Sequence, residues 1–165
     1  MDLNEMKRCL DEVSLQDLKK LEEIISSKEN IIIIGNGGSN AISSHISQDY
    51  TKFLGKKAVC FSDAARITCY MNDYGIEKAY QKFIEHFSYP DTLVILISSS
   101  GNSPNIVNAC QYCIDNNLDM ITLSGFSTDS KLMELSKNSL LHFYVNSSHY
   151  GIVECTHEII LHSVI

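Results

Sequence analysis

The most informative stretch of this 165-residue chain runs Ile31-Ile32-Ile33-Ile34-Gly35-Asn36-Gly37-Gly38-Ser39. An unbroken isoleucine run is typical of a strand that is buried on both faces, and small polar residues after it indicate a turn into a helix. Such a turn points backbone N–H groups and hydroxyls at one spot, where the helix N-terminus also favours an anion. We therefore predict a parallel α/β sheet with an anion site at this turn.

A second stretch of the same kind runs from Leu93 to Ile97 and continues as Ser98-Ser99-Ser100-Gly101-Asn102-Ser103. Because the carboxyl ends of parallel strands meet at one edge of a sheet, we expect both turns to border one ligand site. Its N–H groups and hydroxyls favour a phosphorylated small molecule. The alternative is that each is an ordinary strand-to-helix turn, since short glycine motifs also arise by chance.

Apolar runs alternate with helical patterns along the chain. We expect strands at residues 30–34, 58–61, 92–97, 120–123 and 140–145, and helices at 40–54, 76–86, 105–117, 131–137 and from 152 onward. Residues 3–27 have the spacing of an amphipathic helix or helix pair. The alternation predicts an α/β three-layer sandwich, with a mainly parallel five-stranded sheet flanked by helices, and residues 1–165 as a single domain.

Composition excludes several classes of protein. The formal charge is −7, and basic residues form only short pairs such as Lys19-Lys20, so we expect no nucleic-acid partner. No stretch reaches the roughly 18 apolar residues of a membrane span, and residues 1–5 lack the pattern of a signal peptide. The cysteines are scattered, which favours reduced thiols. We expect a soluble, cytoplasmic protein without a membrane partner.

Several short segments occur here in the order in which a known family has them. They are Gly35-Asn36-Gly37-Gly38-Ser39, His45, Ser62-Asp63, Asn72-Asp73-Tyr74-Gly75, the serine stretch 98–103, Thr122-Leu123-Ser124-Gly125 and a last helix ending near His162. With these segments the chain resembles the SIS (sugar isomerase) domain family, and within it the sedoheptulose 7-phosphate isomerases, also called phosphoheptose isomerases. The resemblance covers almost the whole chain.

This resemblance implies roles for residues of both turns. It implies that the sugar phosphate is held by Ser98, Ser100 and Ser103, with Ser99 beside them, and that the sugar chain is contacted by Asn36, Gly37, Ser39 and Asp73. It also implies a homotetramer whose sites form at subunit contacts. Glu154 stands where the family has a substrate- or metal-contacting glutamine, and Gly151 where an acidic residue is expected, so the exact sugar stays open.

The family reaction converts a ketose phosphate to an aldose phosphate through an enediol. One group moves a proton between C1 and C2 and another handles the oxygens. A carboxylate and a histidine suit these tasks, because burial and neighbours can tune their pKa values. The corresponding residues here are Asp49 and His162. The family has a glutamate where this chain has Asp49, and the shorter side chain changes the reach by about an ångström.

Some family members bind zinc through two histidines and two oxygen-bearing side chains, and the matching positions here are His45, Asp49, Glu154 and His162. His45 and Asp49 are four residues apart and share one face of the expected helix. Zinc is thus the candidate cofactor, and the resemblance adds no other. The alternative is that His45 packs locally and no metal binds.

The leading hypothesis is an isomerase that interconverts sedoheptulose 7-phosphate and D-glycero-D-manno-heptose 7-phosphate for surface-polysaccharide precursors. The alternatives are an isomerase of another phosphosugar and a non-catalytic SIS domain that senses a phosphosugar. A sensor is usually joined to a DNA-binding or catalytic domain, and no basic helix-turn-helix region is visible. A nucleotide-binding protein is disfavoured, because residues 35–39 lack the third glycine of Gly-x-Gly-x-x-Gly.

Overall fold

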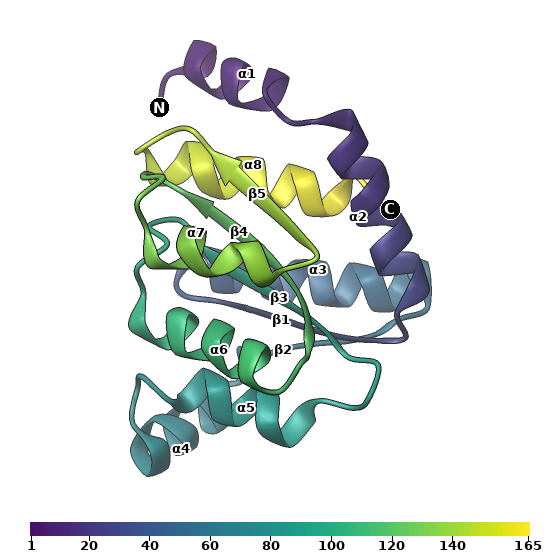
Figure 1. Ribbon diagram of the computed structural model, residues 1–165, viewed down its shortest axis with the longest axis vertical. Coiled ribbons are helices and arrows are strands. Elements are labelled where there is room, and N and C mark those ends of the chain that lie inside the picture. The colour runs from purple at the N-terminus through teal and green to yellow at the C-terminus, as the bar shows by residue number, and fades with distance from the viewer.

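A computed structural model describes residues 1–165 as alternating strands and helices in three layers (Figure 1). The strands are β1 (Asn30–Gly35), β2 (Lys57–Cys60), β3 (Leu93–Ser98), β4 (Asp119–Gly125) and β5 (Leu141–Val145). The α-helices are α1 (Leu3–Asp11), α2 (Leu15–Ser27), α3 (Gly38–Leu54), α4 (Ala64–Tyr74), α5 (Ala79–Phe87), α6 (Pro104–Asp115), α7 (Lys131–Leu135) and α8 (Tyr150–His162), and a 3-10 turn follows α7 at Ser136–Asn138.

The sheet is parallel throughout, and its strand order is β2-β1-β3-β4-β5. The chain leaves β1 toward β2 on one side and returns to β3 on the other. In open sheets of this kind, ligands bind outside the carboxyl ends of the two strands where the order reverses. Both glycine- and serine-rich turns follow those two strands, so the predicted shared edge is confirmed.

The isoleucines of β1 alternate between two hydrophobic cores. Ile31 and Ile33 face α2, α3 and α8, whereas Ile32 and Ile34 face α5, α6 and α7, and none is more than 1% exposed. Burying an aliphatic side chain of this size contributes about 1.5–3 kcal/mol. This burial on both faces explains why β1 has no polar alternation and confirms the predicted three-layer sandwich.

The N-terminal segment 3–27 is a pair of helices rather than one. Asp2 caps α1 by accepting a hydrogen bond from the N–H of Asn4 (2.9 Å), and Ser14 caps α2 by accepting one from Asp17 (3.2 Å). The helix α2 packs on the sheet through Leu21 and Ile25. The helix α1 instead lies at one end of the molecule, against α8 (Figure 1).

One helix, α4, is missing from the sequence expectation. It begins where the Asp63 carboxylate accepts a hydrogen bond from the N–H of Arg66 (2.8 Å), and it packs Ile67 and Met71 on the second core. The expected helix 76–86 begins only at Ala79, because the chain ends α4 and turns at Gly75, whose φ is +79°. An N-cap aspartate before helically spaced apolar residues was the available signal.

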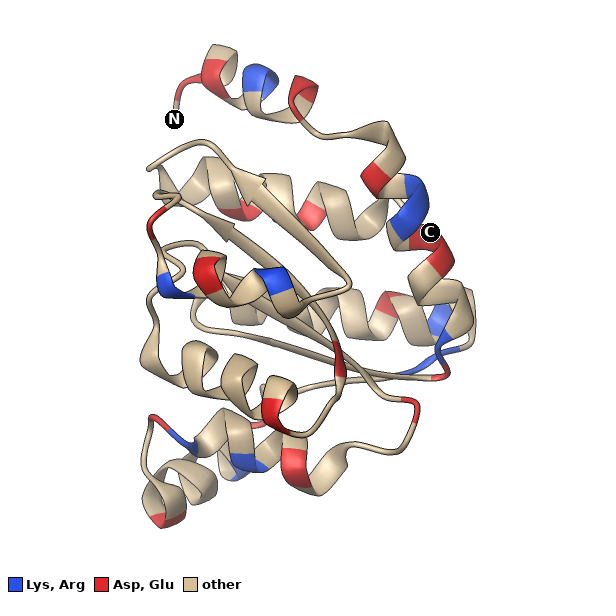
Figure 2. Ribbon diagram, in the orientation of Figure 1, with Lys and Arg blue, Asp and Glu red and all other residues tan.

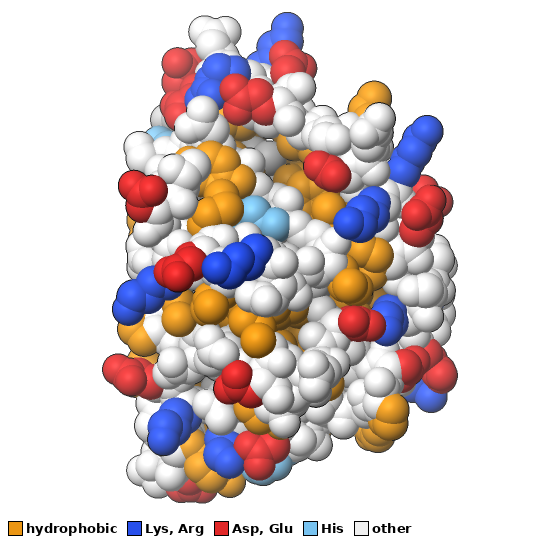
Figure 3. All heavy atoms as spheres, in the orientation of Figure 1, with side chains coloured by type: hydrophobic (Ala, Val, Ile, Leu, Met, Phe, Trp, Pro, Cys, Tyr) orange, Lys and Arg blue, Asp and Glu red, His pale blue; other side chains and the backbone are white.

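The surface carries charges of both signs. Figure 2 shows basic and acidic residues interspersed over the outer helices without a continuous basic face in that view. Apolar side chains reach the surface there in separate patches with charged side chains between them (Figure 3). None of the helices combines the length and the apolar character needed to cross a bilayer.

Candidate active site

A cavity of about 360 Å³ lies at the carboxyl ends of β1 and β3. It is bordered by the starts of three helices, α3, α6 and α8, and most of its lining residues are polar residues or glycines. The lining residues are Asn36, Gly37, Gly38, Ser39, Ile97, Ser98, Ser99, Ser100, Ser103, Tyr150 and Glu154. The structure therefore brings together every residue predicted to bind substrate except Asp73.

The serine turn after β3 is shaped around the cavity. The Ser98 hydroxyl donates to the Ser103 hydroxyl oxygen (3.3 Å), and the Ser99 hydroxyl is buried without a partner. Gly101 has φ +65°, and a Cβ there would overlap the side chain of Ser130, so this position requires glycine. A buried hydroxyl that lacks a partner is costly, and a bound ligand oxygen would satisfy it.

The cavity has no lysine or arginine in its lining. An anion is favoured there by the N-termini of α3 and α6, which present backbone N–H groups and the positive ends of their dipoles. Glu154 contributes the opposite charge: its carboxylate lies directly over Gly38, where any Cβ would overlap it. A carboxylate only accepts hydrogen bonds, so this wall suits the hydroxyls of a sugar rather than a second anionic group.

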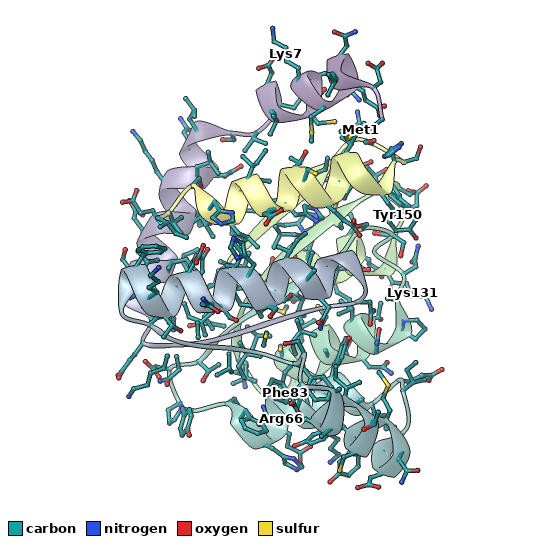
Figure 4. The ribbon with its side chains drawn as sticks, turned by 180° about the vertical axis from the view of Figure 1, so that it is seen from behind. Met1, Lys7, Arg66, Phe83, Lys131 and Tyr150 are labelled. Carbon is teal, nitrogen blue, oxygen red and sulfur yellow. The ribbon has the colours of Figure 1, made fainter.

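A second hollow, also of about 360 Å³, continues from this wall between α3 and α8. Gly38 and Glu154 border both spaces, and the second one extends to His45 and Glu158. Figure 4 shows α3 and α8 running side by side, with Tyr150 at the start of α8. Two adjoining hollows, together called the groove, thus follow α3 and α8 from the serine turn, with Gly38 and Glu154 between them.

Two histidines and an aspartate converge farther along these helices. The Asp49 Oδ2 atom lies 3.3 Å from His162 Nε2 and 3.5 Å from His45 Nε2. One ligand atom from each of the three residues lies within 4.8 Å of the other two. Glu154 stands outside this group, so the structure brings together three of the four predicted zinc ligands and both residues of the predicted catalytic pair.

The His162 ring is oriented by its own helix. Its Nδ1 atom lies 3.0 Å from the carbonyl oxygen of Glu158, which can only accept, so Nδ1 carries a proton. In neutral His162 the Nε2 lone pair then faces an Asp49 oxygen, and two acceptors at this distance require a proton or a cation between them. Two imidazoles and a carboxylate are typical ligands of Zn²⁺, so these residues fit the ion.

Asp73 lies away from the cavity. It sits on the exposed side of α4, where its carboxylate accepts hydrogen bonds from the side chains of Asn72 (2.9 Å) and Cys69 (3.5 Å). Its predicted contact with the sugar is therefore not made within a single chain. Sequence reasoning also missed Tyr150, which lines the cavity and packs edge-on against Phe126, with ring centroids 4.7 Å apart.

Two other histidines make hydrogen bonds inside the protein: His157 on α8 is fully buried, and His142 on β5 is partly buried. The Nε2 atom of His157 lies 3.1 Å from the Ser124 carbonyl oxygen, and the Nδ1 atom of His142 lies 2.7 Å from the Thr122 hydroxyl. Burial lowers the pKa of each to about 4. Both rings are consequently neutral at pH 7 and act as structural hydrogen-bonding groups.

Comparison with known proteins identifies the family. The family model described as SIS domain matches residues 6–125. A phosphoheptose isomerase from Fusobacterium nucleatum is 35% identical over 112 residues, which is 65% of this chain and 58% of that protein. One from Buchnera aphidicola (subspecies Schizaphis graminum) is 32% identical over 123 residues, 69% of this chain and 63% of that protein. The matches thus span less than two thirds of these relatives.

A solved structure shows the same fold. The phosphoheptose isomerase from Neisseria gonorrhoeae superposes with a TM-score of 0.85 over 96% of this chain and 88% of that one, at 22% identity. The ordered motifs, the parallel sheet and the cavity at its switch point agree with the family match. The chain belongs to the SIS domain family.

Proposed function

We propose that this protein is an aldose–ketose isomerase of a sugar phosphate, and that its substrate is sedoheptulose 7-phosphate. The observation that carries the proposal is a pair of adjoining hollows between α3 and α8: the hydroxyl-rich anion cradle lines the first, and the second reaches His45, which contacts the Asp49–His162 pair. The similarity to phosphoheptose isomerases supports the same reaction. The product would be D-glycero-D-manno-heptose 7-phosphate, a precursor for surface polysaccharide.

The length of the groove supports a long sugar chain. Ser39 lines the same cavity as the serine turn, and Asp49 follows it by ten residues on α3, which corresponds to about 15 Å along the helix. In an extended seven-carbon chain, each carbon–carbon bond advances roughly 1.3 Å, so phosphorus and C1 lie roughly 10 Å apart. Hydrogen-bond contacts of about 3 Å at each end close the remaining distance.

The Asp49 and His162 side chains can carry the proton transfers. In the proposed reaction Asp49 takes a proton from C1 of the ketose, a C1=C2 double bond forms, and protonated His162 gives its proton to the carbonyl oxygen on C2. The enediol then returns its O1 proton to His162 while Asp49 delivers the carbon proton to C2, which leaves an aldehyde at C1. Both residues end in their starting states.

Zinc is the proposed cofactor, and neutral His162 would hold it together with His45 and Asp49; the proton transfers described above belong to the metal-free site, in which Nε2 of His162 carries the proton. The convergence of the ligand atoms of the three residues supports this set of ligands. Glu154, the fourth predicted zinc ligand, lines the same hollow as His45. When bound, the ion would polarise the sugar oxygens as a Lewis acid.

A non-catalytic sensor of a phosphosugar is the second candidate. The family match ends at residue 125, so Glu154 and His162 on α8 lie beyond it. The Asp49 and Glu154 positions also depart from the family pattern. A protein of this kind would retain the cradle and bind the sugar phosphate without converting it.

Proton NMR in D₂O distinguishes the two candidates. Purified protein is incubated with sedoheptulose 7-phosphate, first with a chelator and then with added zinc, alongside the Asp49→Asn and His162→Ala variants. His86→Ala is the matched control, because His86 lies on α5 and bonds only Tyr70. Appearance of a heptose 7-phosphate that both site variants lose supports the isomerase. Perturbed substrate signals without any new sugar under either metal condition would refute it and favour the sensor.

We also propose a cytoplasmic homotetramer with sites at subunit contacts. The exposed position of Asp73, outside its own chain's cavity, is consistent with a carboxylate that reaches the site of a neighbouring subunit. All six cysteines are free thiols, which fits a reducing compartment. Light scattering of the wild type and of Asp73→Asn, each assayed for turnover, tests this arrangement: activity loss without dissociation supports it.

A further inference from the structure

We propose that the buried Tyr80 and Asn105 are positioning residues for the ligand: together they fix the Asn36 carboxamide so that one of its N–H bonds faces the sugar phosphate. The inference rests on the proposed phosphosugar site but not on the isomerase chemistry. Tyr80 comes from α5 and Asn105 from the first turn of α6, and sequence reasoning assigned neither residue a role.

Four hydrogen-bond contacts connect these residues and the Gly35 carbonyl group. The Asn36 and Asn105 carboxamides form a reciprocal pair, each donating to the other's Oδ1 atom at 2.9 Å. The Tyr80 hydroxyl lies 2.8 Å from Asn36 Oδ1 and 2.9 Å from the Gly35 carbonyl oxygen. Tyr80 is 3% exposed and Asn105 6% exposed, so water competes little with these bonds. The three side chains connect the turn after β1 to the start of α6.

The direction of the amide pair is determined by the backbone. The N–H of Ile106 donates to Asn105 Oδ1 (3.0 Å), and a backbone N–H cannot reverse its role. Asn105 Oδ1 must therefore face Asn36 Nδ2, which in turn places Asn36 Oδ1 toward Asn105 Nδ2 and the Tyr80 hydroxyl. Burial raises the pKa of Tyr80 to about 12, so its hydroxyl keeps the proton that it donates.

This orientation of the amide pair leaves one N–H of Asn36 free at the cavity. One proton of Asn36 Nδ2 goes to Asn105, and the other has no acceptor in the protein. Asn36 lines both the main cavity and an adjoining space of about 280 Å³ beside Ser103. A fixed, unused N–H donor at the junction of the two turns is suited to an oxygen of the ligand, and its orientation costs no entropy on binding.

Tyr80→Phe tests the inference while leaving the ring that packs edge-on against Phe61. The Kd for sedoheptulose 7-phosphate, measured by calorimetry, is expected to rise about tenfold, in line with one poorly oriented hydrogen bond. If turnover occurs, KM should rise similarly and kcat should change less than threefold. Tyr112→Phe is the control, because that α6 hydroxyl makes no hydrogen bond in the structure and should leave Kd unchanged.

NMR of the side-chain amides separates positioning from general destabilisation. The Asn36 and Asn105 NH₂ signals of unliganded protein should shift in Tyr80→Phe and not in Tyr112→Phe. Should Tyr80→Phe fold poorly, Asn105→Asp removes the donor to Asn36 and should give the same rise in Kd. Unchanged Kd with either substitution would overturn the inference. A wild type that binds the sugar phosphate but never isomerises it would remove the proposed reaction alone.

Discussion

Lowering the pH from 7.5 to 5 should destabilise this fold through the buried His157 and the partly buried His142. His157 is fully buried on α8, and its Nε2 atom faces the Ser124 carbonyl oxygen, while its Nδ1 atom has no partner. His142 lies on β5, with its ring nitrogens 2.7 and 3.2 Å from the hydroxyls of Thr122 and Ser124. Burial lowers the pKa of both to about 4, so the folded protein excludes protons that the unfolded chain accepts near pH 6.5.

The sign and size of the effect follow from linkage. The stability that neutral histidines contribute is fully present above pH 6.5 and is lost as the pH falls toward 4, below which no further loss occurs. Between pH 7.5 and 5, a histidine shifted to about 4 costs roughly 2 kcal/mol, because the unfolded form is mostly protonated at pH 5. His142 is less completely buried, so its share should be smaller.

Urea unfolding followed by circular dichroism at both pH values measures this loss. Carboxylates also titrate, so the informative quantity is the difference between wild type and His157→Gln, which keeps a side-chain donor toward Ser124. The variant should lose roughly 2 kcal/mol less than wild type on acidification. The exposed-site control His86→Gln should match wild type. Equal losses for wild type and His157→Gln, or a wild-type His157 ring that titrates near pH 6.5 by NMR, would contradict the reasoning.

Three further changes probe the groove. Asp49→Asn should lower isomerase turnover by about 10²–10⁴-fold while leaving the calorimetric Kd for the sugar phosphate within about threefold, and wild-type turnover would exclude Asp49 as the base. Gly38→Ala should displace the Glu154 carboxylate and raise the Kd for the sugar phosphate about tenfold. The urea midpoint should not fall, because alanine favours helix. An unchanged Kd would show that Glu154 does not contact the ligand. Tyr50→Phe removes a buried hydrogen bond to the Leu161 carbonyl oxygen (2.8 Å) that joins α3 to α8. It should lower the free energy of unfolding, measured in urea, by about 1 kcal/mol and weaken zinc binding. Unchanged zinc affinity would limit the role of this hydrogen bond to stability.

The sheet could be predicted because its signals are local. Unbroken aliphatic runs and the turns after them lie within a few residues of each other, and each expected strand lies within two residues of the observed one at either end. The helix α4 was missed although Asp63 is a good N-cap, because the flanking Ser62-Asp63 and Asn72-Asp73 segments were interpreted only as ligand motifs.

The site was only partly predictable for a different reason. Serines 98–103 form one short segment, so their shared role follows from a single turn. The Asn36–Asn105 pair joins residues 69 positions apart, and the Asp49–His162 contact joins residues 113 apart. Such contacts depend on how helices pack across the sheet, and no spacing rule along the chain predicts them. Tyr80 could not be found either, since one tyrosine in an amphipathic helix is indistinguishable from an ordinary core residue.

The geometry also separates ligand binding from chemistry along the chain. The hydroxyls and N–H groups of the cradle come mainly from residues 36–39 and 98–103, within the stretch that the SIS domain model matches. His162 lies on α8, beyond that stretch, and meets Asp49 only because α3 and α8 run side by side (Figure 4). A change in α8 can therefore alter or abolish the proposed reaction while the anion cradle persists. For this reason, binding and turnover have to be measured separately in every variant of this protein.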